Sequence, residues 1–158
     1  MSPAARGWAL ALAVAAAAVV LDQATKQLAA GALDGSERVS LGLGFELADV
    51  RNRGIAFGLF GDGQGLVIAV TLAALALVVA YFALDPARPG LWVATGLLCG
   101  GALGNLADRL REDEVIDFVD PPLWPAFNLA DVAIVAGITA IVVYQARSPG
   151  RDRGPHGS

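Results

Sequence analysis

Long runs of hydrophobic residues without a single charge dominate the chain. Four of them are bounded by charged residues: Gly7–Leu21, Gly63–Leu84, Pro89–Ala107 and Val132–Ala146. A helix needs about 20 apolar residues to cross the hydrocarbon core of a bilayer. The second and third runs reach that length, and the first and fourth are marginal. The pattern predicts a mainly α-helical membrane protein with four transmembrane helices, at about residues 7–26, 64–84, 89–107 and 131–146.

A different period separates the first two predicted helices. Hydrophobic residues alternate with small or polar ones between Val39 and Leu47. Strict alternation is typical of a half-buried β-strand. We expect an extended segment within Asn52–Phe60 to pair with it, giving a small extracytoplasmic β-sheet over about residues 37–60. The alternative is a folded loop that only covers the helix ends.

Composition supports a membrane protein and narrows its chemistry. The 158-residue chain is 56% hydrophobic, well above an ordinary soluble protein. A net charge of −4 without a basic stripe argues against nucleic acid as a partner. Cys99 is the only cysteine, which excludes an intramolecular disulfide and a zinc site built on thiolates. The single histidine, His156, lies in the polar tail 148–158, which we expect to be disordered and cytoplasmic.

The length fits one integral membrane domain over residues 1–147. Its first hydrophobic run could be mistaken for a cleaved signal peptide. The run continues into the polar segment Leu21–Lys26 without a clear small-x-small motif, so we interpret it as a retained helix. Four helices place both termini on one side of the membrane. The basic first residues and the basic tail indicate that this side is the cytoplasm.

Polar residues gather at matching ends of the predicted helices. In an antiparallel bundle, these ends share one side of the membrane, where carboxylates from different helices can meet. Each residue also has a plain structural interpretation. Asp22 and Lys26 are four residues apart and can form an ion pair at a helix end. Asn105, Asp108 and Arg109 can form a polar cluster that ties helix ends together.

Two further carboxylates are candidates for chemistry. Asp117 interrupts the apolar run Val115–Val119, which is unusual for a surface acid. Asp131 opens the fourth helix, where it or Asn128 can serve as the N-cap. Two carboxylates that face each other in a poorly hydrated site share one proton. One can then act as a base toward water while the other donates a proton, which gives peptide hydrolysis without Ser, Cys, His or metal.

Five short motifs occur in order along the chain. They are Asp22-Gln23-x-x-Lys26, Asn52-x-Gly54-x-Ala56-Phe57, Gly100-Gly101-x-x-Gly104-Asn105-x-x-Asp108-Arg109, Val115-x-Asp117-Phe118 and Pro125-x-Phe127-Asn128-x-Ala130-Asp131. Each motif is weak alone. Together, from about Trp8 to Tyr144, they make the chain resemble bacterial lipoprotein signal peptidase, the type II signal peptidase of the plasma membrane.

The resemblance implies a membrane-embedded aspartic endopeptidase with four helices, an extracytoplasmic β-cradle and no cofactor or metal. Its catalytic positions match Asp117 and Asp131. Positions that bind substrate or shape the site match Asn52, Gly54, Asn105, Asp108, Arg109 and Asn128, and supporting positions match Asp22 and Lys26. The helix N-terminus favours an ionised Asp131, which leads to the hypothesis that Asp117 carries the shared proton.

The resemblance also implies the substrate and the setting. The enzyme removes the signal peptide from diacylglyceryl-modified prolipoproteins by cutting just before the lipidated cysteine. Its expected partners are these substrates and membrane lipids. We expect a monomer in the bacterial inner membrane, with the active site at the outer face and the termini in the cytoplasm.

Two departures from the family pattern and two alternative functions complete the picture. The Asp117–Asp131 connection is short for the family, which leaves the role of a flexible segment over the site open. Val132 occupies a position where Ser is frequent. One alternative is a small transporter or ion-binding membrane protein whose carboxylates bind a cation through oxygen ligands. The other is a structural membrane subunit, in which the polar helix ends serve only as anchors.

Overall fold

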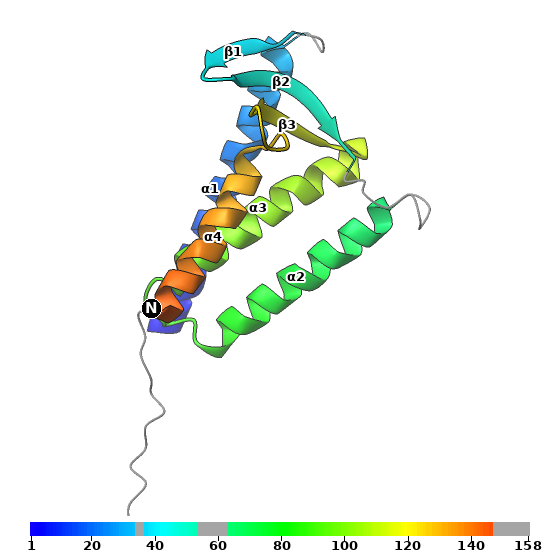
Figure 1. Cartoon of the computed structure of the whole chain (residues 1–158). Coiled ribbons are helices and arrows are strands. Elements are labelled where there is room, and N and C mark those ends of the chain that lie inside the picture. Colours follow the sequence, from blue (N-terminus) through cyan, green and yellow to red (C-terminus); the bar gives the residue numbers. More distant parts are fainter. Residues whose placement is uncertain (34–36, 54–62, 147–158) are drawn as a thin grey trace, which may run out of the picture.

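The computed structural model describes residues 1–33, 37–53 and 63–146. Within them lie four helices and three strands: α1 (Pro3–Ala32), β1 (Val39–Gly42), β2 (Phe45–Asn52), α2 (Gln64–Leu84), α3 (Leu91–Glu112), β3 (Val115–Asp120) and α4 (Leu129–Ala146). The helices run up and down, and the sheet covers one end of them (Figure 1). The first residues of α1 and the last of α4 lie together at the opposite end.

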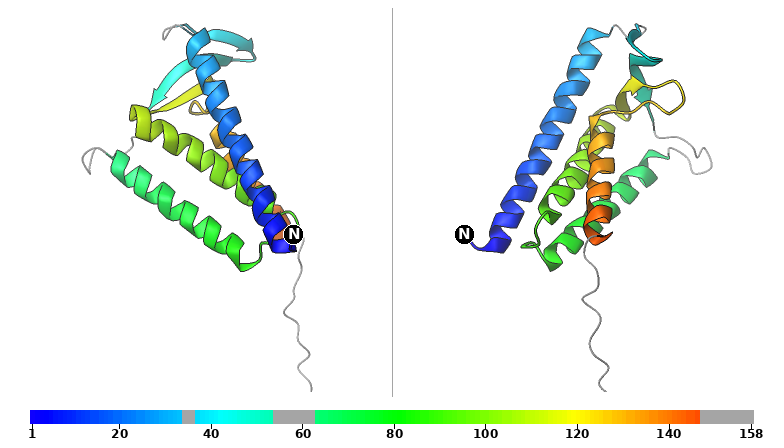
Figure 2. Two further views of the ribbon diagram at one scale, coloured as in Figure 1. Left: turned by 180° about the vertical axis from the view of Figure 1, so that it is seen from behind. Right: turned by 60° about the vertical axis from the view of Figure 1, so that its left-hand side comes forward.

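Helix α3 is the central element. Its backbone lies close to those of α1, α2 and α4, whereas the backbone of α2 comes close only to that of α3 among the described helices and strands. Both views in Figure 2 show α2 set apart from α1 along most of its length. Near the end of α2, Phe82 is fully buried, and its ring packs edge-on against Trp8 of α1 with centroids 4.8 Å apart. Phe82 therefore anchors one end of α2 in a small core with Ala11 and Leu91.

Glycines let α3 approach its neighbours closely. A Cβ at Gly96 would lie 2.6 Å from Cβ of Val14, and one at Gly100 would lie 2.6 Å from Cβ of Ala18. A Cβ at Gly104 would lie 2.5 Å from a carboxylate oxygen of Asp22. These separations leave no room for a side chain. Gly96, Gly100 and Gly104 therefore line one closely packed face of α3, and that face packs on α1.

Three helices are long and apolar enough to cross a membrane: α1, α2 and α4. Among the described residues, α3 does not join them, so the prediction of four transmembrane helices is confirmed only in part. The physical reason is composition. Glycine, Thr95 and Asn105 lower the hydropathy of α3, and its buried residues face the other helices instead of the surroundings.

The three strands form an antiparallel sheet in the order β1-β2-β3. The prediction of one strand from Val39 to Leu47 is wrong, because the chain turns at Gly42-Leu43-Gly44 and forms a hairpin. All three turn residues have positive φ: 88° at Gly42, 54° at Leu43 and 82° at Gly44. The two glycines adopt such angles without strain, because they have no Cβ.

The described residues supply the third strand of the sheet from later in the chain. Strand β2 itself reaches Asn52 and pairs with β3, which lies between α3 and α4. Residues 54–60 of the predicted partner segment lie outside the described part of the chain. The β2–β3 register sets Asn52 opposite Val115 and Val50 opposite Asp117. The sheet thereby brings two predicted site residues from distant parts of the chain together.

Candidate active site

The N-terminus of α4 is held by a reciprocal pair of hydrogen bonds. The backbone N–H of Asp131 donates to Oδ1 of Asn128 at 3.0 Å, and the backbone N–H of Asn128 donates to Oδ2 of Asp131 at 3.1 Å. This is a capping box, in which the N-cap and the third helical residue satisfy each other's free donors. The N-cap interpretation of Asn128 is therefore confirmed, and Asp131 takes part in the same cap.

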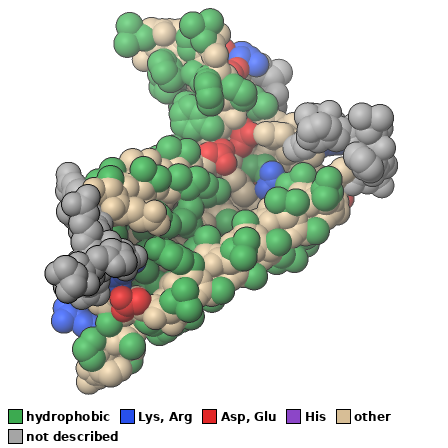
Figure 3. Space-filling view, turned by 60° about the horizontal axis from the view of Figure 1, so that its bottom comes forward, with side chains coloured by type: hydrophobic (Ala, Val, Ile, Leu, Met, Phe, Trp, Pro, Cys, Tyr) green, Lys and Arg blue, Asp and Glu red, His purple; other side chains and the backbone are tan. Residues whose placement is uncertain are grey.

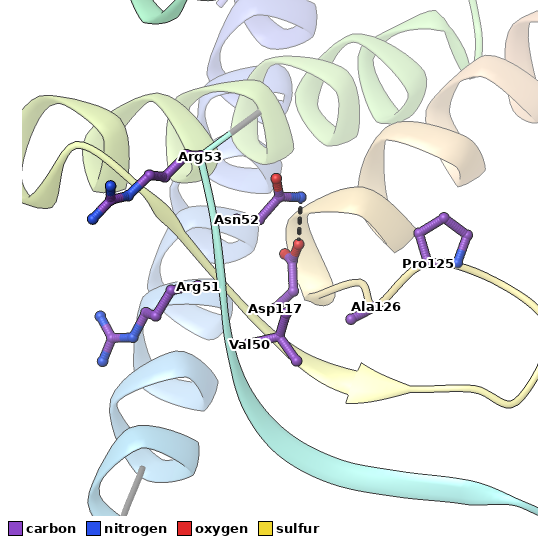
Figure 4. A pocket seen from close by; sticks show the side chains of 7 residues that line it. All are labelled: Val50, Arg51, Asn52, Arg53, Asp117, Pro125 and Ala126. Carbon is purple, nitrogen blue, oxygen red and sulfur yellow. Dashed lines mark hydrogen bonds between the residues drawn. The ribbon is translucent and has the colours of Figure 1, made fainter. Parts of the chain in front are cut away.

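Asp117 lies on β3 and is only 2% exposed. Its Oδ1 accepts a hydrogen bond from Nδ2 of Asn128 at 2.7 Å, and its Oδ2 accepts one from Nδ2 of Asn52 at 2.8 Å. Figure 4 shows Asn52 on β2 and Asp117 on β3 pointing toward each other across the strands. The strand pairing explains this contact, since Asn52 lies close to Asp117 in the register.

The two carboxylates are joined through Asn128. Its side-chain amide donates to Asp117, and its backbone N–H donates to Asp131. The remaining oxygen of Asp131, Oδ1, accepts from Nδ2 of Asn105 at 2.8 Å. Each of the four carboxylate oxygens therefore accepts one N–H from an asparagine. This arrangement fixes the orientation of both acids without supplying a cation directly to either.

Burial raises the pKa of Asp117 above its ordinary value. The hydrogen bonds from Asn52 and Asn128 oppose this shift, whereas the nearby charge of Asp131 adds to it. The net effect is a raised pKa, so Asp117 holds its proton to a higher pH than an ordinary aspartate does. Its environment thus suits a carboxyl group that gives up a proton during a reaction.

Beneath the two acids lies a buried ionic cluster. Nζ of Lys26 is 2.8 Å from a carboxylate oxygen of Asp22 and 2.7 Å from one of Asp108. Nζ of Lys26 also donates to Oδ1 of Asn105 at 2.8 Å. The predicted ion pair between Asp22 and Lys26 is confirmed, and the predicted polar cluster of Asn105 and Asp108 ties α3 to α1 and α4. Oδ1 of Asp22 extends the cluster by accepting the backbone N–H of Ala130 at 2.9 Å.

Two glutamines that the sequence did not single out join these helices. Nε2 of Gln23 donates to Oδ1 of Asp108 at 2.7 Å. Nε2 of Gln64, at the start of α2, donates to the carbonyl oxygen of Arg109 and to Oδ1 of Asp113, both at 2.9 Å. A glutamine near a helix end can also face solvent, so its position in a single sequence does not reveal such a role. Gln64 holds the end of α2 that Phe82 does not.

A pocket of about 410 Å³, which we call the polar pocket, opens on the sheet side of Asp117. Its lining comes from β2, β3 and the turn before α4: Val50, Arg51, Asn52, Arg53, Asp117, Pro125 and Ala126. In Figure 4, Arg51 and Arg53 point away from Asp117, on the other face of β2. Both are engaged elsewhere, because Arg51 pairs with Asp49 and Glu112, and Arg53 lies 3.3 Å from Glu114.

A second, larger cavity of about 500 Å³ lies between α2, α3 and α4. Its walls are mostly aliphatic, and only one region carries polar groups from Asn105, Arg109 and Asp131, with Thr71 on α2. Figure 3 shows a hollow walled largely by hydrophobic side chains, with acidic and basic groups at one end. We call this cavity the apolar groove. Asp131 borders the apolar groove and Asp117 borders the polar pocket, so the two acids lie between them.

The structure thus brings together nearly all the predicted site residues. Asp117, Asp131, Asn52, Asn105 and Asn128 form one hydrogen-bonded group, with Asp22, Lys26 and Asp108 directly behind it. Nη1 of Arg109 donates to the backbone carbonyl of Asn105 at 3.2 Å, and Arg109 lines the apolar groove. Gly54 lies outside the described residues. In the described ranges, no three His, Cys, Asp or Glu side chains are grouped as metal ligands would be.

Known proteins share this arrangement of sequence and fold. The family model for signal peptidase (SPase) II matches residues 14–147. A lipoprotein signal peptidase of Moorella thermoacetica is 45% identical over 115 residues, which cover 72% of this chain and 76% of that protein. One from Nitratidesulfovibrio vulgaris is 37% identical over 154 residues, covering 90% and 93% of the two chains.

Two solved structures described as bacterial membrane enzymes have the same fold. One has a TM-score of 0.79 at 28% identity and covers 90% of this chain and 94% of that one. The other has a TM-score of 0.78 at 26% identity and covers 94% of both chains. With the family model matching most of the sequence and the relatives spanning most of its length, this chain belongs to the signal peptidase II family of membrane peptidases.

Proposed function

We propose that this protein is an aspartic endopeptidase that removes the signal peptide from diacylglyceryl-modified prolipoproteins, cutting just before the lipidated cysteine. The observation that carries the proposal is the pair Asp117 and Asp131, bridged by Asn128 between a polar pocket and an apolar groove. Family membership favours a peptidase over an ion-binding protein or a structural subunit.

The proposed reaction uses one proton shared by the two acids. Ionised Asp131 removes a proton from a water molecule, and the resulting hydroxide attacks the scissile carbonyl carbon. Asp117 donates its proton to the carbonyl oxygen, giving a tetrahedral diol. When the diol collapses, the C–N bond breaks, Asp131 gives the proton that it took from water to the leaving amine, and Asp117 takes a proton from a diol hydroxyl, which restores both acids. The raised pKa of Asp117 supports its role as the acid, and the position of Asp131 in the first turn of α4 supports its role as the base.

The position of the two acids supports a substrate that lies partly in the membrane. A signal peptide and an acylated cysteine are apolar and partition into the bilayer. The apolar groove between α2, α3 and α4 offers aliphatic walls to such a segment and ends at Asp131. We propose that α3 also spans the membrane, which gives four transmembrane helices. The termini then lie in the cytoplasm, and the site lies at the outer face of the inner membrane.

Processing of a diacylglyceryl-modified precursor by purified protein tests the proposal. Asp117→Asn and Asp131→Asn should each abolish cleavage, because neither asparagine can take part in the proton transfer. Asp120→Asn is the matched control. It makes the same change on the same strand, at a residue whose partner is the exposed Arg38, 2.6 Å away. If Asp117→Asn or Asp131→Asn inserts normally and releases product at the wild-type rate, the proposed mechanism is wrong.

A further inference from the structure

Lys26 is the most deeply buried cation of the described chain, and it makes two hydrogen bonds and a further close ion pair. Its side chain is 2% exposed. Three oxygens surround Nζ within 2.8 Å, from Asp22, Asp108 and Asn105. An ammonium has three N–H donors and no acceptor. Two of its three partners are carboxylates, which together carry one more charge than Lys26 does, but the third is a neutral amide that electrostatic pairing does not require.

The third contact determines which way the amide of Asn105 points. Because the ammonium can only donate, it must face Oδ1 of Asn105 and not Nδ2. Oδ1 also accepts from Nδ2 of Asn128 at 3.0 Å, so both of its lone pairs are occupied by donors. Nδ2 of Asn105 is therefore left to donate to Asp131, at 2.8 Å. A flipped amide would face the ammonium with N–H groups and the carboxylate of Asp131 with an oxygen.

Resting on the function proposed above, we propose that Lys26 is a positioning residue that acts on the reaction through Asn105. It locks the Asn105 side-chain amide so that its N–H always donates to Asp131, and it fixes the acceptor for Asn128, which holds Asp117. Lys26 itself contacts neither acid in the structure. Lys26 therefore fixes the geometry of both carboxylates indirectly. It holds the amide of Asn105, which contacts Asp131 itself and contacts Asp117 through Asn128.

Several charged groups surround Asp131 and, together with the N–H donor from Asn105, determine how readily it takes up a proton. They are Asp22 and Lys26 on α1, Asp108 and Arg109 on α3, and Asp117 on β3; the described lining of α2 at the groove is uncharged. A fixed N–H donor stabilises the ionised form of the base. Losing it should move the acid limb of the rate profile to higher pH by about one unit.

The test compares variants in the same precursor assay over a range of pH. Lys26→Met removes the donor but leaves two buried carboxylates unpaired, which endangers folding. Lys26→Met combined with Asp22→Asn keeps the net charge of the cluster and is the preferred variant. We expect kcat to fall roughly 10- to 100-fold with KM nearly unchanged, and the acid limb to rise. Arg111→Gln, which alters an exposed cation 3.1 Å from Gln23, is the control and should leave the profile in place.

Asn105→Ala gives an independent test that keeps all three charged side chains of the ion cluster, Asp22, Lys26 and Asp108. It should move the acid limb to higher pH in the same way. Adding Lys26→Met and Asp22→Asn to Asn105→Ala should lower kcat no further, because the Asn105 change and the Lys26 change act through the same amide. The inference is overturned if the acid limb of Asn105→Ala stays in place or if the effects on kcat multiply. If Asp117→Asn remains active, the proposed function has failed; if it is inactive while these profiles do not move, only the role of Lys26 is refuted.

Discussion

At the scale of single residues, Asn128 has two roles, of which the sequence predicted one. Its Oδ1 caps α4, and its Nδ2 holds Asp117. The cap was readable from the order Asn128-x-x-Asp131, because capping is local. The contact with Asp117 was not, since it depends on how β3 packs against the start of α4. Lys26 illustrates the same limit: its spacing from Asp22 predicted the ion pair, but nothing in the spacing pointed to Asn105 on another helix.

The two roles of Asn128 can be separated by substitution. Serine can still cap the helix but is too short to reach Asp117, whereas alanine can do neither. We expect Asn128→Ser to keep nearly wild-type thermal stability and Asn128→Ala to lose about 1 kcal/mol more. Both should process precursor much more slowly than wild type. Unfolding and cleavage measured on the same preparations decide the matter, and a fully active Asn128→Ser would refute the role of its amide at Asp117.

At the scale of elements, the sequence predicted the helices better than the sheet. Charge-free runs locate helices because the signal is local and long. The strand prediction failed at Gly42 and Gly44, which preserve the alternating pattern while turning the chain back. The partner of β2 could not be read at all, because β3 lies more than 60 residues further along and its pairing follows from how the helices are arranged.

The close packing of α3 against α1 gives a prediction at this scale. Gly100→Ala places a Cβ 2.6 Å from Cβ of Ala18, so the helices must separate. We expect a loss of about 1–3 kcal/mol in the free energy of unfolding, typical of overpacking. Gly31→Ala on α1 is the matched control, since its Cβ meets nothing within 4 Å. It should be neutral or stabilising by up to about 1 kcal/mol. Equal stability of the two variants would contradict the packing described here.

At the scale of the whole molecule, the two acids lie where the sheet meets the helices. Asp117 lines the polar pocket, and Asp131 lines the apolar groove. The groove exists because the backbone of α2 lies close only to that of α3 among the described elements. Side chains hold α2 near its two ends, where Gln64 bonds to α3 and Phe82 packs on Trp8 of α1. The sequence predicted that polar helix ends would meet on one side. It could not predict a groove, because a groove depends on the distance between helices and not on their composition.

Filling the groove should weaken substrate binding without changing the chemistry. Ala74 on α2 lines the groove, whereas Leu77 on the same helix is 72% exposed and does not. We expect Ala74→Phe to raise KM for the lipidated precursor several-fold, with the pH dependence of kcat unchanged. Leu77→Phe should leave both unchanged. Steady-state kinetics in detergent or lipid decide this, and an unaltered KM for Ala74→Phe would argue against the groove as the substrate site.

The most direct test of the central claim is the pH dependence of precursor cleavage by the wild-type protein. Two carboxylates that share one proton give a bell-shaped profile of rate against pH. The two apparent pKa values of this profile describe the coupled pair and not either residue alone. The rate should fall at low pH, when the base takes up a proton. Because burial raises the pKa of Asp117, its proton is retained above the usual range of a carboxyl group, and the rate should fall again as pH rises through that raised value. A profile that is flat between about pH 4 and 9 would contradict a titrating pair of aspartates.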